Sequence, residues 1–136
     1  MSRPAFVSRN GVLIPPGEAS VSVFNPAIYG AYGVYESMQV AEGVVFEQDA
    51  HLSRLAQSAA ILELPLPGDL DEIGRWVDAV VAETGMPEFT VRLFIIGPEN
   101  GGAACAYIWP QPPTRYPTGF YRDGVAAVTF EARRYL

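Results

Sequence analysis

The periodicity of hydrophobic and polar residues changes twice along the chain. The first 47 residues have the pattern of short strands punctuated by turns, and the stretch 89–110 is rich in the branched and aromatic residues typical of β-strands. Residues 49–85, between these regions, carry apolar side chains at helical spacing. The order predicts an α+β fold, in which an antiparallel or mixed sheet has two helices packed on one face.

Turn residues divide the β regions into hairpins. Asn10-Gly11 lies between "AFV" and "VLI", and both residues tolerate the positive φ of a tight turn. Glu42-Gly43 lies in the same way between "VYESMQV" and "VVFEQ". Both dipeptides therefore predict hairpins, and "GVAAVTFEARRYL" at the end of the sequence predicts one further strand.

The two helical segments have recognisable starts and apolar stripes. Asp49 is predicted to cap the first helix, and Asp69 with Glu72 forms a capping-box pattern for the second. The first stripe comprises Leu52, Leu55, Ala56, Ala59 and Leu62. The second stripe comprises Leu70, Ile73, Val77, Val80 and Val81, and Gly85 is predicted to end that helix.

Composition limits the possible partners. The 136 residues suit a single domain, and the net charge of −6 argues against nucleic acid, which is bound through clustered basic residues. No stretch approaches the roughly 18 apolar residues of a membrane span, and no signal peptide is evident, so we expect a cytoplasmic protein. Cys105 lies in the apolar run "AACAYIW" and is interpreted as a small buried hydrophobic residue.

His51, Arg54 and Ser58 share the side of the first helix that faces away from its apolar stripe. They form either a solvated polar face or a site for a phosphate or carboxylate, because a guanidinium is a planar, permanently charged fork of donors. One histidine without paired cysteines does not make a metal site. Gly30 and Gly33 match neither a P-loop nor a dinucleotide fingerprint, and most such pairs are turns.

The order of these pieces resembles a known family. A Gly-x-x-Gly-Val-Tyr-Glu strand start, a Glu-Gly turn, a strand ending in Phe and then His-Leu-x-Arg-Leu-x-x-Ser-Ala on a helix are similar to the N-terminal domain of class IV aminotransferases. These fold-type IV pyridoxal-phosphate enzymes include branched-chain aminotransferases, D-amino-acid transaminases and aminodeoxychorismate lyases. The match is closest from Tyr29 to Leu66 and continues more loosely through Arg92 to "FEARRYL".

The resemblance implies roles for particular residues. Arg54 corresponds to the helix arginine that grips the phosphate of pyridoxal 5'-phosphate, and His51 to its companion, which we expect to pack or orient. Tyr35 corresponds to the aromatic residue that lines the substrate pocket, where its hydroxyl meets a substrate carboxylate. Arg92 stands where branched-chain members carry an arginine near the pocket, although an arginine on a strand is also commonly one partner of a surface ion pair.

The chain also departs from the family pattern. The family loop often reads Tyr-Gly-Asp-Gly, whereas residues 29–33 read Tyr-Gly-Ala-Tyr-Gly. D-amino-acid transaminases place a carboxylate-binding arginine where this chain has Ile96-Gly97-Pro98, which argues against D-amino-acid specificity.

All nine basic residues are arginines, so the Schiff-base lysine of the family is absent and no residue of the chain is predicted to be catalytic. Arginine cannot replace that lysine because it stays protonated. We therefore expect residues 1–136 to be the N-terminal small domain of a longer enzyme, without its C-terminal catalytic domain and inactive alone. The rival interpretation is a natural short protein that kept the scaffold as a binding module.

The function implied by the resemblance is amino-group transfer between an amino acid, with the branched-chain type favoured, and a 2-oxo acid. The domain would position cofactor and substrate in a homodimeric, pyridoxal-phosphate-dependent transferase. An aminodeoxychorismate lyase-like enzyme and a non-catalytic binding module remain the alternatives.

Overall fold

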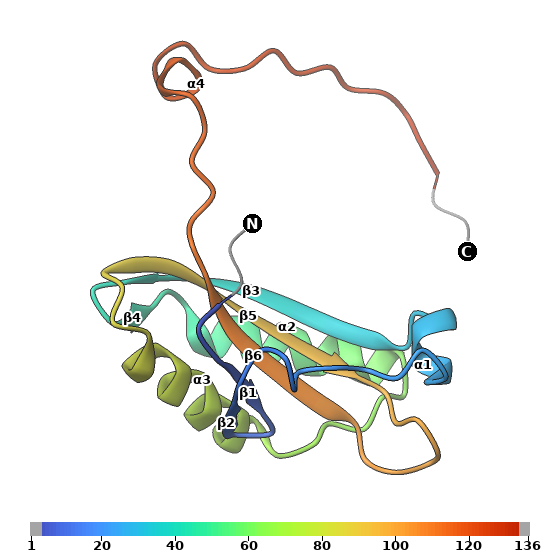
Figure 1. Cartoon of the computed structure of the whole chain (residues 1–136). Helices are drawn as coiled ribbons and strands as arrows, with labels where there is room; N and C mark the ends of the chain where they lie inside the picture. Colours follow the sequence, from blue (N-terminus) through green and yellow to red (C-terminus); the bar gives the residue numbers. More distant parts are fainter. Residues whose placement is uncertain (1–3, 134–136) are drawn as a thin grey trace.

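The computed structural model describes residues 4–133, and its strands form one six-stranded sheet in the order β2-β1-β6-β5-β3-β4 (Figure 1). All the paired neighbours are antiparallel, which confirms the antiparallel form of the predicted sheet. The strands are β1 (Val7–Arg9), β2 (Val12–Ile14), β3 (Gly33–Ala41), β4 (Val44–Val45), β5 (Glu88–Ile96) and β6 (Cys105–Gln111).

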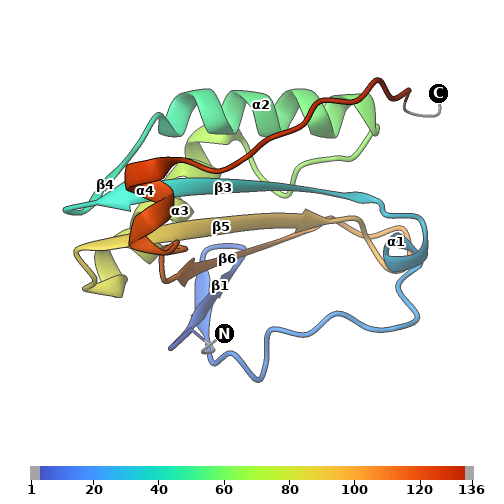
Figure 2. The same cartoon turned by 90° about the horizontal axis from the view of Figure 1, so that it is seen from above.

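Two long helices pack on one face of this sheet, as the sequence predicted (Figures 1 and 2). They are α2 (Gln48–Ile61) and α3 (Leu70–Thr84), and two shorter helices are α1 (Pro26–Tyr29) and α4 (Thr118–Asp123). The α+β class is therefore confirmed. Within residues 4–133, none of the helices has the length and apolar character needed to span a membrane.

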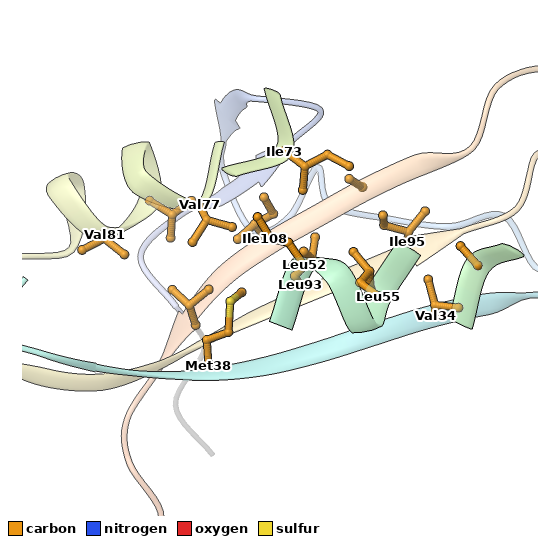
Figure 3. Packing of buried hydrophobic residues seen from close by; sticks show 14 of the residues in the cluster. Val34, Met38, Leu52, Leu55, Ile73, Val77, Val81, Leu93, Ile95 and Ile108 are labelled. Carbon is orange, nitrogen blue, oxygen red and sulfur yellow. The ribbon is translucent and has the colours of Figure 1, made fainter. Parts of the chain in front are cut away.

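The main core lies between the sheet and these two helices (Figure 3). Alternate residues of β3 and β5 point towards the helices, because successive side chains of a strand leave it on opposite faces. From α2 and α3 the core receives most of the apolar stripes predicted from the sequence, including Leu52, Leu55, Ile73, Val77 and Val81. The prediction is wrong for Leu62, which follows the last residue of α2 and is exposed. The alternation of β3 thus separates residues that meet α2 from residues on the other face.

A smaller apolar cluster covers part of the opposite face of the sheet. Val7, Ala27, Ile96 and Tyr107 are buried there, and the chain between β2 and α1 packs against them through Ala19 and Val21. Cys105 packs against this cluster but is only half-buried, so its predicted burial is only partial. Neither α2 nor α3 packs on this face, and α4, which overlaps β3 in Figure 2, stands away from the sheet in Figure 1. We call this face the open face.

Local signals in the sequence explain most element boundaries. Both predicted hairpins are present, and Asn10 and Glu42 have φ values of 48° and 50° in their turns. Asp69 caps α3 by accepting a 2.7 Å hydrogen bond from the Glu72 amide, as predicted. The predicted cap at Asp49 is wrong, because α2 begins at Gln48, two residues earlier than a cap at Asp49 implies. Asp49 lies inside the first turn, where a carboxylate interacts favourably with the helix dipole.

The segment after β6 leaves the body of the domain and carries α4 at its bend (Figure 1). The predicted strand over 124–136 is wrong for the described residues up to 133, which form no strand; residues 134–136 lie outside the described chain. A strand requires a neighbour for its backbone hydrogen bonds, and this segment lies away from the sheet. Several of its large apolar side chains are exposed: Tyr116, Phe120, Tyr121, Val125, Val128 and Phe130.

Candidate functional site

Three polar side chains from β3 and α2 form a compact ionic cluster. Glu36 accepts hydrogen bonds from Arg54 through both oxygens, with Nε to Oε1 at 2.7 Å and Nη2 to Oε2 at 2.6 Å. His51 Nδ1 lies 2.8 Å from the same Oε2. The three-residue spacing of His51 and Arg54 on α2 places both above Glu36.

Burial within this cluster is uneven. The Glu36 side chain is 6% exposed, whereas that of Arg54 is 64% exposed. His51 is intermediate at 18%. A buried carboxylate is costly unless it is paired, and Glu36 is paired on both oxygens. Arg54 therefore contacts a buried carboxylate on one side and solvent on the other.

The electrostatics of Glu36 reflect two opposing effects. Burial alone would raise the pKa of its carboxyl group, but hydrogen bonds and charge interactions with Arg54 and His51 outweigh burial and lower the pKa below its usual value. The same contact raises the pKa of Arg54. Glu36 is thus ionised at neutral pH, and the pair is fully charged.

The distances around His51 assign its proton. One ring nitrogen cannot donate to Glu36 and accept from Arg54 at the same time. An ionised Glu36 can only accept, so its 2.8 Å contact requires that Nδ1 carry a hydrogen and donate it to Oε2, and the 3.0 Å contact with Arg54 Nη2 is then not a hydrogen bond. His51 therefore supports Glu36, consistent with the orienting role expected for it.

Arg54 keeps donors that Glu36 does not use. A guanidinium carries N–H groups on Nε, Nη1 and Nη2. The bonds to Glu36 occupy Nε and one hydrogen of Nη2. Among residues 4–133 no hydrogen bond from Nη1 is found, so this end of Arg54 fits a phosphate group or another anion.

Tyr35 and Arg92 lie together on the open face, on the side of the sheet opposite Glu36. Tyr35 is 70% exposed and pairs with Phe94 of β5, two register positions from the Ser37–Arg92 pair, which is the next pair on the same face. Arg92 donates from Nε to Oε1 of Gln111 at 3.2 Å, so its observed partner is an amide and not the carboxylate of a surface ion pair.

An apolar cleft of about 360 Å³ lies next to these two residues. Phe94, Tyr107 and Trp109 contribute to its lining, and their register partners include Tyr35 and Arg92. The remaining lining comes from Pro4, Val7, Pro16, Ala19 and Val21. Tyr35 and Arg92 do not line this cleft themselves, but both are strand neighbours of residues that do, on the open face.

The edge of the sheet connects this face with the ionic cluster. β4 pairs with β3 only at Val40 and Ala41, so β3 is an edge strand beside Tyr35 and Glu36. No strand in the described part of the chain therefore pairs with β3 at that edge, where its two faces meet. The structure thus brings Tyr35 and Arg92 together on one face and places Arg54 on the other, across the same strand.

Sequence reasoning assigned no role to Glu36. A usable signal was present, because Glu36 occupies the inward phase of β3, in which Val34 and Met38 are apolar. A charged residue in that phase requires a buried partner.

The glycines of the loop before β3 are structural: Gly30 ends α1, and Gly33 allows close approach to the Ile95 carbonyl. Residues 4–133 contain no cluster of three or more side chains suited to a metal ion.

Comparison with known proteins identifies the family. A family profile described as "Amino-transferase class IV" matches residues 33–130. A bifunctional aminodeoxychorismate lyase / D-amino acid transaminase from Mycobacterium tuberculosis is 32% identical over 132 residues, which cover 92% of this chain and 44% of the relative.

Solved structures show the same fold. The Escherichia coli branched-chain amino acid aminotransferase superposes with a TM-score of 0.77 at 22% identity, over 86% of this chain and 43% of that one. The Thermobaculum terrenum branched-chain amino acid aminotransferase, solved in its PLP-form, gives 0.68 at 17% identity, over 82% and 41%. The chain thus spans less than half the length of the proteins that it matches.

Proposed function

This chain belongs to the class IV aminotransferase family, and from that membership and its site we propose that it is the cofactor- and substrate-positioning domain of a pyridoxal-phosphate-dependent aminotransferase. The reaction moves an amino group between an amino acid and a 2-oxo acid. The observation that carries the proposal is the partly exposed guanidinium of Arg54, held by Glu36, the residue that follows Tyr35 on β3.

Arg54 binds the phosphate of pyridoxal 5'-phosphate. Its free donors and permanent charge suit a phosphate dianion, and the rigid helix α2 limits reorganisation on binding. The Thermobaculum terrenum enzyme of the same fold was solved in its PLP-form, which supports the choice of cofactor. The cofactor, when bound, supplies the electron sink for chemistry at the substrate carbon.

Tyr35 and Arg92 bind the substrate carboxylate on the open face. The tyrosine hydroxyl and the guanidinium are both donors, and the neighbouring cleft is apolar. An aliphatic side chain fits such a lining, so branched-chain amino acids are the favoured substrates. The Ile96-Gly97-Pro98 sequence leaves no arginine at the position expected for D-amino-acid specificity.

The chain contains no lysine, so proton transfer through a lysine amine requires residues outside these 136. Our proposal therefore concerns the complete gene product, for which we also propose a homodimer. This domain binds and orients, and it holds no catalytic residue of its own.

The test uses the complete gene product, assayed with branched-chain L-amino acids as donors and 2-oxoglutarate as acceptor. Amino transfer is expected, and Arg54→Ala should weaken pyridoxal 5'-phosphate binding by about tenfold or more. Arg75→Ala, an exposed arginine on α3, is the matched control and should bind normally. Unchanged affinity in Arg54→Ala would reject the phosphate role.

A lyase is the second candidate, because the relative from Mycobacterium tuberculosis carries both activities in its name. Turnover of aminodeoxychorismate without any amino acceptor would select the lyase over the transaminase.

A further inference from the structure

Glu36 is a charged residue in a position that the fold otherwise reserves for apolar side chains. Val34, Met38 and Val40 share its phase on β3 and belong to the main core. A carboxylate there is unfavourable unless its oxygens are paired, and both are, with Arg54 and His51. The side-chain hydrogen bonds found for Glu36 therefore go to two polar residues of α2.

The geometry leaves Arg54 ready for a second anion. Glu36 occupies the side edge of the guanidinium, formed by Nε and Nη2, through two parallel hydrogen bonds. Two such bonds fix the plane of the group as well as its position. The end edge, formed by Nη1 and the other hydrogen of Nη2, is a second pair of parallel donors. One guanidinium can thus hold Glu36 and a phosphate together.

We propose that Glu36, supported by the Nδ1–H of His51, is a positioning residue that orients Arg54 for the phosphate of the cofactor. This inference rests on the proposed function. An arginine side chain that is 64% exposed would sample many rotamers without a tether, and ordering it would oppose phosphate binding. Glu36 and His51 supply that order before the cofactor arrives.

In Glu36→Gln, the loss of the negative charge and the loss of orientation should change the affinity for phosphate in opposite directions. Removal of a negative charge near an anion site should by itself strengthen anion binding, whereas loss of orientation should weaken it. A phosphate on the end edge of Arg54 would be separated from Glu36 by the guanidinium and would contact water, so their repulsion is screened. Orientation therefore dominates, and the sign of the change identifies the mechanism.

The binding test measures dissociation constants of the complete gene product by fluorescence titration. Glu36→Gln should weaken pyridoxal 5'-phosphate binding by about fivefold or more. Binding of pyridoxal, which lacks the phosphate, should not change. Glu47→Gln, an exposed carboxylate at the start of α2, is the charge-matched control and should leave both constants unchanged. Unchanged or tighter phosphate binding in Glu36→Gln would overturn the positioning role.

A second measurement uses the wild-type protein, so it requires neither enzymatic activity nor a correctly folded variant. In ¹H–¹⁵N spectra of the cofactor-free protein, the Nε–H of Arg54 should exchange with water much more slowly than that of exposed Arg75, because it donates to Glu36. Equal exchange rates would overturn the proposal. If Arg54→Ala weakens phosphate binding but Glu36→Gln does not, only the positioning role fails; if Arg54→Ala has no effect, the proposed function fails too.

Discussion

Tyr35 and Glu36 are consecutive residues of β3, and their side chains leave the strand on opposite faces of the sheet. Tyr35 is exposed on the open face, whereas Glu36 is buried against α2 and holds Arg54. Because β4 does not extend along this part of β3, both side chains lie at an edge of the sheet. A single edge strand thus presents a substrate-binding candidate on one face and orients a phosphate-binding candidate on the other.

Replacement of Tyr35 by Phe should impair substrate binding and leave the fold intact. The ring stays and is exposed, so the free energy of unfolding should not change. Loss of one hydrogen bond to a charged carboxylate should lower kcat/KM by about tenfold in the complete gene product. Tyr116→Phe, which removes an exposed hydroxyl far along the chain, serves as the control. A Tyr35→Phe protein with the kcat/KM of the wild type would remove Tyr35 from the site.

Arg92→Met should lower kcat/KM for the amino acid by about tenfold or more, since a charged hydrogen-bond donor to the carboxylate is lost. Affinity for pyridoxal 5'-phosphate should be unaffected, because Arg92 lies on the open face and Arg54 on the other. Arg115→Met removes an arginine whose ion pair with Glu88 is exposed, and steady-state kinetics of this control should match the wild type. Parallel losses in both variants would point to a general charge effect.

Local patterns in the sequence were sufficient for most of the fold. The turns at Asn10-Gly11 and Glu42-Gly43 depend on residues that tolerate positive φ, and the cap at Asp69 depends on one nearby amide. Such signals act over a few residues, so they can be read without knowledge of tertiary contacts. The final strand could not be assigned in this way, because a strand depends on a neighbour, and residues 124–133 have none in the described chain.

For the candidate site, too, the features that depend on local spacing could be predicted, and those that depend on tertiary contacts could not. Helical spacing placed His51 and Arg54 together, and the family resemblance pointed to Arg54, Tyr35 and Arg92. The pairing of Glu36 with Arg54 spans 18 positions and depends on how α2 crosses β3, which no local pattern encodes. Helical spacing alone left Arg54 either on a solvated polar face or in an anion site, and the structure shows a group that is largely exposed yet bound to a buried partner.

Acid should destabilise this domain partly through Glu36. Its folded-state pKa is lowered, so its contribution to stability is present above the ordinary glutamate pKa of about 4.3 and is lost as pH falls through the lower folded-state value. The free energy of unfolding should therefore decrease in the wild type over this acidic range. Glu36→Gln removes the titrating group, so the difference in free energy of unfolding between the wild type and the variant should become smaller as the pH falls. Denaturant unfolding at a series of pH values measures this difference, and a difference that does not change with pH would contradict the interaction of Glu36 with Arg54 and His51.

The last prediction concerns Gly33, at the start of the strand that carries Tyr35 and Glu36. A Cβ at this position would lie 2.8 Å from the backbone oxygen of Ile95 and 3.2 Å from the Phe94 ring, and a backbone carbonyl paired within the sheet cannot easily move aside. Gly33→Ala should therefore lower the free energy of unfolding by about 1–3 kcal/mol, the usual scale of overpacking.

Gly17→Ala is the matched control for Gly33→Ala, because no atom lies within 4 Å of its added Cβ. The same change there should be neutral or stabilising by about 0.5 kcal/mol, since alanine reduces the freedom of the unfolded chain. Thermal or denaturant unfolding compares the two. If both variants have the stability of the wild type, close approach to β5 does not require glycine at position 33.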